Sequence, residues 1–319
     1  MKVARTLFMT LSCLLSVTGR PLSAASPAET QRERGGTFTD ELNIVTDSEA
    51  IDRATVNITV TNLCPFNLWI HGAGSSGVLQ PDDQLFTPNT TRNYTAPSEW
   101  SAARVEAYKN GPRQNQIEKV EMTFNRNGFG EQVLHYNVTY VDWVGLPVAI
   151  EGVGSGGDCK VAGCFKPVNQ LLNGCPDGLN DGDRCVAART FCLNPVNNGN
   201  PYCHVFDAKI NECADRFGDC QGARGSSTAE VYACSGPFFS QNPKYCAAIN
   251  RGMLNDPFSS DKNQYYKNGP FNTYSKWVHE SCPGLYAFPY DDFPGNAGES
   301  GFHSCSGSTQ LNITFCPAR

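Results

Sequence analysis

Ala54-Thr-Val-Asn-Ile-Thr-Val-Thr-Asn-Leu-Cys64 is a stretch in which apolar and polar residues alternate. Such alternation places the apolar side chains on one side of an extended chain, which predicts a half-buried β-strand. The same pattern returns over residues 311–315 near the end of the chain. Between these two stretches lies a long cysteine-rich region, so the sequence predicts a β-sandwich interrupted by an excursion.

An alternating run at residues 120–124 and a run rich in β-branched and aromatic residues at 136–143 favour additional strands. Helices are expected only around 203–217 and 243–252. Composition then divides the chain into five parts. These are a signal peptide (1–24), a flexible N-terminal segment (25–53), the first part of the sandwich (54–152), a disulfide-rich lobe (153–282) and the closing strands of the sandwich (283–319).

The first 24 residues have the composition of a secretory signal peptide. Lys2 and Arg5 precede an apolar run from Leu7 to Val17, and Leu22-Ser-Ala24 offers a small-residue cleavage site. The run is too short to cross a bilayer as a stable helix, although an uncleaved anchor is the alternative. We therefore expect a secreted protein, located outside the cell or in a cell wall, that is not embedded in a membrane.

The chain of 319 residues is acidic, with 25 Lys and Arg against 31 Asp and Glu. Cleavage after residue 24 would remove three cations and no acid, which makes the remainder more acidic still. Because an acidic protein binds polyanions poorly, we expect no nucleic-acid partner.

Cysteine usage agrees with secretion. Of 15 cysteines, Cys13 lies in the expected signal, and the even number that remains predicts a disulfide framework. None of the five histidines stands in a zinc-binding pattern, so metal binding is the weaker alternative, and no cofactor is expected. The chain also contains five sequons for N-glycosylation, at Asn57, Asn89, Asn93, Asn137 and Asn312.

The surroundings of the cysteines resemble those of thaumatin-like proteins. The opening strand, which ends at Cys64 and is followed by Leu68-Trp69, is similar to the family's first strand with its cysteine and tryptophan. The other similar stretches are Asp158-Cys159 to Cys164, Asn173-Gly174-Cys175-Pro176, Tyr245-Cys246, Ser281-Cys282-Pro283 to Tyr290-Asp291-Asp292, and Thr314-Phe315-Cys316-Pro317. This resemblance implies a mainly β fold, a thaumatin-like β-sandwich with an inserted disulfide-rich lobe containing short helices.

Three stretches are more similar to the family-64 β-1,3-glucanases, which share this architecture and a cleft. They are Val120 to Phe124, Asn137 to Pro147, and the aromatic segment Tyr286 to Asp292. The two resemblances together cover residues 54–317, except that residues 176–233 depart from thaumatin spacing.

The thaumatin-like resemblance also implies a disulfide pattern. It pairs Cys64 with Cys316, Cys159 with Cys305, and Cys164 with Cys282. Apart from that pattern, we expect a further pair between Cys234 and Cys246. The pairing of the remaining cysteines stays open; these are Cys175, Cys185, Cys192, Cys203, Cys213 and Cys220.

Glycoside hydrolysis commonly uses two carboxyl groups, one as acid and one as base or nucleophile. In a regular strand Glu121 shares a face with Lys119 and Thr123, and by itself this is also the pattern of an ordinary solvated glutamate. The resemblance to the glucanases implies that Glu121 is the catalytic acid within a Glu-x-Thr pattern, and that Asp142 is the base. The alternative role of Asp142 is to cap the turn before Pro147.

Five further residues are candidates for sugar binding, the first of which is Thr123 of the Glu-x-Thr pattern. Asp291 resembles the cleft aspartate of the Tyr-Asp-Asp segment, and Arg104 lies near the position of the cleft arginine. Trp143 and Tyr290 offer aromatic faces against which sugar rings pack. The alternatives are a strand-end turn residue for Asp291, a surface position for Arg104, and core packing for the two aromatic residues.

One departure weakens the thaumatin-like pattern. The chain has Asn137 where thaumatin-like proteins carry an aspartate, and a glycan on this sequon would crowd the cleft. The first hypothesis is therefore a secreted, monomeric protein that acts on β-1,3-glucan or a related cell-wall polysaccharide as an inverting endo-β-1,3-glucanase. A non-catalytic thaumatin-like glucan-binding or defence protein is the second, and a sweet, toxic or inhibitory protein the third.

Overall fold

The structure is a computed structural model that describes residues 55–269, 271–293 and 301–318. The expected signal peptide, the N-terminal segment and Cys13 lie outside these residues. Among the residues described, no helix combines the length and the apolar character needed to cross a membrane.

The alternating stretch from Ala54 to Cys64 forms β1 (Thr55–Asn62) in a five-stranded sheet. This strand pairs in parallel with β15 (Gln310–Phe315) and antiparallel with β5 (Thr90–Pro97), so both ends of the described chain share one sheet. β10 (Val148–Val153) and β12 (Val161–Gly163) complete the order β12-β10-β15-β1-β5. The apolar residues of β1 are buried and their polar neighbours lie on the open face, as strand alternation requires.

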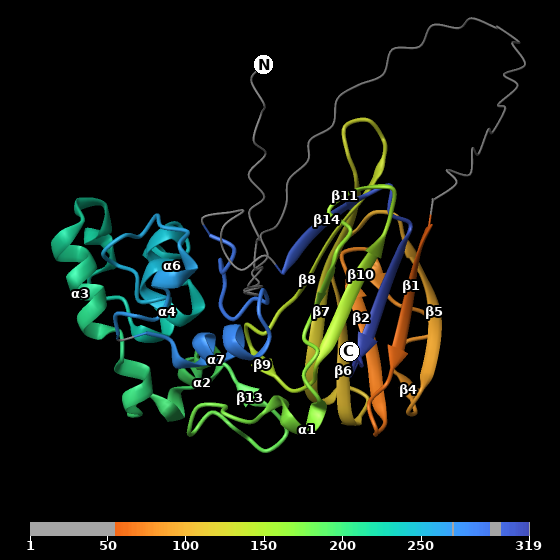
Figure 1. Cartoon of the computed structure of the whole chain (residues 1–319), viewed down its shortest axis with the longest axis horizontal. Coiled ribbons are helices and arrows are strands. Elements are labelled where there is room, and N and C mark those ends of the chain that lie inside the picture. The colour runs from red at the N-terminus through yellow and green to blue at the C-terminus, as the bar shows by residue number, and fades with distance from the viewer. Residues whose placement is uncertain (1–54, 270, 294–300, 319) are drawn as a thin grey trace, which may run out of the picture. The chain divides into compact units, whose positions relative to one another are not determined.

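An eight-stranded sheet packs against the first (Figure 1). Its order is β11 (Gly156–Gly157), β14 (Phe302–Ser306), β8 (Gln132–Val138), β7 (Gln114–Arg126), β6 (Trp100–Gly111), β2 (Leu68–Gly74) and β3 (Gly77–Val78), with β4 (Gln84–Phe86) also on β2. Val120, Met122 and Phe124 of β7 are buried in the core between the sheets. Their intervening neighbours on β7 therefore project from the opposite face of the sheet.

A lobe of short helices lies beside the larger sheet, on the left of Figure 1. A two-stranded sheet of β9 (Trp143–Val144) and β13 (Cys185–Val186) leads into it. The helices and 3-10 helices are α1 (Val168–Leu171), α2 (Ala188–Leu193), η1 (Pro195–Asn197), η2 (Pro201–His204), α3 (Asp207–Arg216), η3 (Gly218–Ala223), α4 (Thr228–Ala233), α5 (Gly236–Phe239), α6 (Pro243–Asn250), η4 (Lys262–Gln264) and α7 (Thr273–Ser281). The expectation of a mainly β fold with short helices is confirmed.

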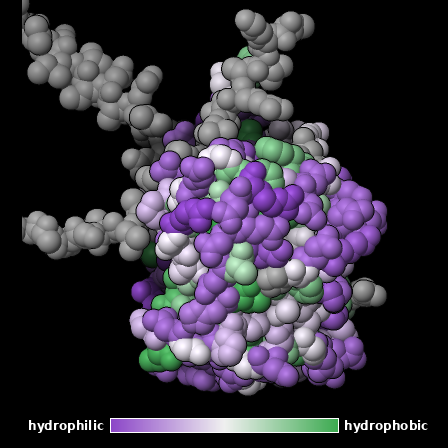
Figure 2. Space-filling model, turned by 90° about the vertical axis from the view of Figure 1, so that its left-hand side faces the viewer, coloured by the Kyte–Doolittle hydropathy of each residue, from purple (hydrophilic) through white to green (hydrophobic). Residues whose placement is uncertain are grey.

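The lobe has its own small core. Phe206 and Tyr232 are buried, and their ring centroids lie 5.0 Å apart. Tyr232 belongs to α4, which begins with a capping box formed by Ser227 and Glu230. Figure 2 shows the outer face of the lobe, where hydrophilic residues predominate and apolar ones are scattered.

Seven disulfides join the cysteines of the described residues. Cys64–Cys316, Cys159–Cys305 and Cys164–Cys282 are the pairs that the thaumatin-like resemblance implies, and Cys234–Cys246 is the further pair expected from the sequence. The cysteines whose pairing the sequence left open join near neighbours, as Cys175–Cys185, Cys192–Cys203 and Cys213–Cys220. Long-range bridges thus close the sandwich, whereas local bridges brace the lobe.

Candidate functional site

Four side chains line up across the open face of the larger sheet. In the strand register Arg104 of β6 lies opposite Glu121 of β7, Glu121 opposite Asn137 of β8, and Asn137 opposite Phe302 of β14. Directly opposed residues in a sheet project to the same face, so the four side chains are neighbours in one row. We call this set the Glu121 row.

Glu121 is the only acid in the Glu121 row. Its neighbours Val120 and Met122 are buried in the core, which turns the carboxylate outward, with 45% of the side chain exposed. Asn137 Nδ2 donates a hydrogen bond to Glu121 Oε2 over 3.4 Å. The amide that replaces the expected aspartate therefore contacts the carboxylate directly.

Asp142, the second predicted carboxylate, lies close to the Glu121 row. Lys119 Nζ donates to Asp142 Oδ2 and lies 3.9 Å from Glu121 Oε1, so one ammonium group lies between the two carboxylates. Arg189 Nη1 is 3.1 Å from Asp142 Oδ1, and Thr190 Oγ1 donates to the same oxygen. The structure thus brings Glu121 and Asp142 to a common cation.

These contacts determine the charge on Asp142. Burial acts to raise the pKa of its carboxyl, but the positive charges of Lys119 and Arg189 outweigh burial and hold the pKa below its usual value. Asp142 is therefore an ionised carboxylate at neutral pH. This is the state that a general base must have before it accepts a proton.

The loop that carries Asp142 is fixed to β7 by a buried acid. Glu118 Oε2 accepts hydrogen bonds from the backbone N–H groups of Gly145 and Leu146, at 3.5 and 3.3 Å. The loop approaches β7 so closely that a Cβ on Gly145 would lie 2.3 Å from the carbonyl oxygen of Ile117. The backbone of Asp142 also accepts from Ala187 N at 2.8 Å, next to α2. Asp142 is therefore held at the junction of sheet and lobe.

The segment after α7 supplies a further acid near Glu121. Tyr286 forms an isolated bridge with Thr139, just beyond β8, and its side chain is hydrogen-bonded to Asp292. Burial raises the pKa of the Tyr286 phenol, and the negative charges of Asp292 and Glu121 raise it further. The phenol is therefore a neutral hydrogen-bond donor in this group of acids.

The expectation that Asp291 contacts a ligand is wrong for this structure. Asp291 is fully buried, and its Oδ1 accepts from Arg251 Nη2 at 2.9 Å. Its Oδ2 accepts from His279 Nε2 at 2.7 Å and from Ala287 N at 2.8 Å. Both oxygens are engaged in the interior, so Asp291 fixes the lobe, and its exposed neighbour Asp292 is the one that reaches toward Tyr286.

The other predicted residues hold structural contacts as well. Arg104 Nε donates to Glu106 Oε1 at 2.6 Å, and Thr123 Oγ1 accepts from the backbone of Ala102. The remaining two are aromatic: Arg184 lies 5.0 Å above the ring of Trp143, and the Tyr290 hydroxyl donates to the carbonyl of Ser240.

Sequence reasoning missed two features of this site. Lys119 was noted only as a neighbour of Glu121 on the strand, and its contact with Asp142 depends on a loop 23 residues later. Arg189 lies in the segment that departs from thaumatin spacing, so no resemblance drew attention to it. Both contacts with Asp142 are set by tertiary structure, so no pattern within the sequence pointed to them.

His71, Asp82 and Asp83 form a group whose ligand atoms lie within 4.8 Å of one another, the arrangement required to hold a metal ion. However, Arg113 Nη2 lies 2.8 Å from Asp82 Oδ2, and Arg113 Nε lies 3.1 Å from Asp83 Oδ2. A guanidinium group therefore already supplies the compensating positive charge, and we assign no metal to this group.

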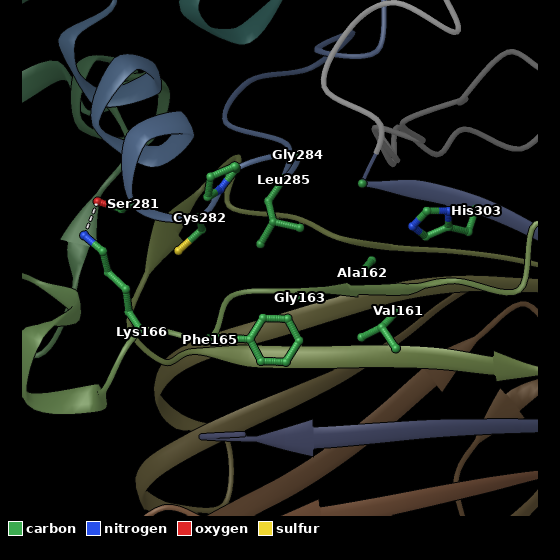
Figure 3. A pocket seen from close by; sticks show the side chains of 12 residues that line it. Val161, Ala162, Gly163, Phe165, Lys166, Ser281, Cys282, Gly284, Leu285 and His303 are labelled. Carbon is green, nitrogen blue, oxygen red and sulfur yellow. Dashed lines mark hydrogen bonds between the residues drawn. The ribbon is translucent and has the colours of Figure 1, made fainter. Parts of the chain in front are cut away.

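A cavity of about 320 Å³ opens between β12, the start of β14 and the segment after α7 (Figure 3). Lys166, which donates to Ser281 Oγ, and the Cys164–Cys282 bridge line it, together with Phe165 and His303. His303 alternates with Phe302 along β14 and so lies on the opposite side of the sheet from the Glu121 row. None of the described residues that line the cavity is an acid, so it offers no carboxylate pair for acid–base chemistry.

Comparison with known proteins gives two groups of relatives. The family of β-1,3-glucanases known as glycoside hydrolase family 64 matches residues 193–315. Pathogenesis-related protein 5 of Arabidopsis thaliana is 25% identical over 285 residues, which cover 82% of this chain and 90% of that protein. A glucan endo-1,3-beta-glucosidase of Prunus avium is 26% identical over 186 residues, which cover 57% of this chain and 49% of that protein.

Two solved structures share the fold. A β-1,3-glucanase domain from Clostridium beijerinckii superposes with a TM-score of 0.59 at 18% identity, covering 82% of this chain and 98% of that one. A laminaripentaose-producing β-1,3-glucanase from Paenibacillus barengoltzii, solved with laminarihexaose, gives a TM-score of 0.60 at 18% identity and covers 88% and 81%. The sandwich with its lobe is therefore an arrangement already seen in family 64.

Proposed function

The chain belongs to the superfamily that unites thaumatin-like proteins with family-64 β-1,3-glucanases, and from this premise we propose that it is a secreted, inverting endo-β-1,3-glucanase. The observation that carries the proposal is the placement of Glu121 and Asp142 on either side of Lys119. Two carboxyl groups close to each other, in different surroundings, are the requirement for glycoside hydrolysis.

In this reaction Glu121 acts as the general acid. Its proton passes to the glycosidic oxygen as the bond from that oxygen to the anomeric carbon breaks. Asp142, held ionised by Lys119 and Arg189, takes a proton from a water molecule while the water oxygen attacks the anomeric carbon from the opposite side. The products are two shorter glucans, and the new hemiacetal has the inverted configuration.

The inverting route requires space for water between the carboxylates, a separation of ~6.5–9.5 Å. Lys119 contacts both acids and so holds their nearest oxygens no farther apart than the lower limit of this range, and the anomeric configuration of the first product decides whether the route is inverting. Sugar hydroxyls would bind to the polar groups around Glu121, namely Asn137, Thr123, Arg104 and Asp292.

Hydrolysis of laminarin by the purified protein tests the proposal. We expect Glu121→Gln and Asp142→Asn each to lower kcat by ~10²–10⁴-fold, because each removes one proton-transfer group. Glu151→Gln is the matched control, since Glu151 is an exposed acid on the five-stranded sheet. NMR of the first product should show the α-anomer. An initial β-anomer, or full activity of Glu121→Gln, would contradict the mechanism.

A second candidate is a defence protein that binds β-1,3-glucan without cutting it. Asn137 favours this alternative, because it leaves the site one carboxylate short of the thaumatin-like pattern. Similarity to Pathogenesis-related protein 5 over 82% of the chain also supports it. Retention of the wild-type protein on insoluble β-1,3-glucan, with no sugar released, would select this candidate over the enzyme.

A further inference from the structure

We propose that Phe302 and His135 form a platform against which one glucose ring of the glucan packs, a few sugar units from the bond that Glu121 acts on. The inference rests on the proposed function and adds a residue pair that determines how the chain is held. Neither residue was among the candidates drawn from the sequence.

The strand register places the platform on the catalytic face. Phe302 lies opposite Asn137, which lies opposite Glu121, and His135 lies opposite Thr123 on the same side of the sheet. Phe302 is thus two strands from Glu121, a distance of about 10 Å at the usual spacing of strands. A polysaccharide that crosses the strands along the Glu121 row would meet Phe302 within a few sugar units of the acid.

The two rings are arranged as a platform. Their centroids are 5.6 Å apart and their planes differ by 13°, so His135 supports the Phe302 ring in one orientation. Phe302 is nevertheless 43% exposed, although it is a large apolar residue on a polar face. The C–H groups on one side of a glucose ring pack on such an aromatic surface.

β14 as a whole is not an exposed strand, although Phe302 is exposed. His303 and Cys305, which alternate with it, are buried on the other side of the strand. Ser304, the next residue on the open face, is small and lies opposite His135. Among the described residues, Phe302 thus presents part of its ring to solvent on the open face of the sheet.

The charge of the platform suits a neutral sugar. Burial lowers the pKa of His135 below its usual 6.5, so the imidazole is neutral at neutral pH. A neutral ring attracts no counter-ion and needs little desolvation when a sugar covers it. The platform therefore contributes affinity through packing of its aromatic faces on the sugar. Discrimination against acidic polysaccharides comes from the acids around it, not from the platform.

The test measures the binding of a soluble laminari-oligosaccharide by calorimetry in the Glu121→Gln background, which prevents turnover. Phe302→Ala should weaken binding by roughly 10-fold, whereas Phe302→Tyr should retain it because the aromatic face is kept. Phe129→Ala is the control, since Phe129 is 96% exposed at the tip of the β7–β8 hairpin and has been given no role. In the active enzyme Phe302→Ala should raise KM and leave kcat within about 3-fold.

The possible failures are distinguishable. If the parent protein binds the oligosaccharide and Phe302→Ala binds equally well, the platform is overturned while the proposed function stands. If the parent protein does not bind β-1,3-glucan, the proposed function and the platform are both overturned. Equal weakening by Phe302→Ala and Phe302→Tyr would also contradict packing on an aromatic face, because the tyrosine keeps that face.

Discussion

The ammonium group of Lys119 donates a hydrogen bond to Asp142 and lies 3.9 Å from the carboxylate of Glu121. Asp142 has a second cation, Arg189, at 3.1 Å, whereas the other oxygen of Glu121 accepts from the neutral amide of Asn137. The two acids therefore have unequal surroundings. Unequal surroundings are how an enzyme divides the roles of acid and base between two carboxyl groups.

Replacement of Lys119 by methionine should move the acid limb of the pH–activity profile to higher pH. The variant removes a positive charge from Asp142, so the pKa of the base rises and activity is lost at a higher pH on acidification. The profile of kcat/KM on laminarin measures this shift. Lys160→Met is the control, since Lys160 is a highly exposed lysine that pairs with Asp158. A profile unchanged by Lys119→Met would mean that Asp142 is not the base.

Asp142 should also stabilise the fold in a pH-dependent manner. Its folded-state pKa lies below the usual 3.8, so its contribution is present at neutral pH and is lost as the pH falls through the folded value. Denaturant unfolding of wild type and Asp142→Asn should show the largest difference at pH 7. The difference should shrink below about pH 4. A difference that grows on acidification would contradict the sign of the shift.

Glu118 should show the opposite dependence. Burial raises the pKa of this carboxyl well above its usual 4.5, more than its backbone hydrogen bonds lower it. Its contribution to stability is therefore complete below the unfolded value and is lost as the pH rises. Glu118→Gln, which carries no charge, should cost the most stability at pH 4, and the cost should fall toward pH 8. Unfolding free energies at the two pH values measure this, and a cost that rises with pH would refute the assignment.

Local pattern was sufficient for the fold class because each strand buries one face. The alternation in residues 54–64 and 311–315 survives in β1 and β15, whose apolar side chains are in the core. The pairing of the six lobe cysteines could not be predicted from the sequence, because six cysteines allow 15 connectivities and no pattern selects among them. The structure resolves them as three bridges between near neighbours.

The site was less predictable because its contacts cross the chain. The alternation in β7 predicts that the Glu121 side chain faces outward, as it does in the structure. Alternation does not indicate which of the two adjacent aspartates after Tyr290 is exposed. The buried partners Arg251 and His279 decide that Asp291 points inward. No sequence pattern pointed to Phe302, because its position beside Asn137 depends on the pairing of two residues 165 apart in the chain. That separation is roughly the length of a domain.

The long-range disulfides should matter more for stability than the local ones. Cys64–Cys316 joins residues 252 apart, whereas Cys213–Cys220 joins residues 7 apart. In the chain-entropy account their loss costs about 5 and about 2 kcal/mol respectively. Denaturant unfolding of the two double serine variants gives the comparison. An equal loss from both would show that constraint of the unfolded chain is not the main contribution.

N-glycosylation should spare Asn137 when the full chain is secreted from a eukaryotic host. Asn57, Asn89 and Asn93 are exposed on or beside the five-stranded sheet, on the side away from the Glu121 row. The Asn137 amide instead donates to Glu121, and Thr139 of the same sequon is buried. A glycan there would displace the contact with the catalytic acid.

Mass spectrometry of glycopeptides decides the matter. We expect glycans at one or more of the three exposed asparagines and an unmodified Asn137, and enzymatic removal of the glycans should leave kcat/KM on laminarin unchanged. Asn137→Gln removes the sequon and should leave the total glycan mass as it was. Loss of one glycan from that variant would show that Asn137 is modified, and the sugar would then stand over Glu121, where a glucan chain has to bind.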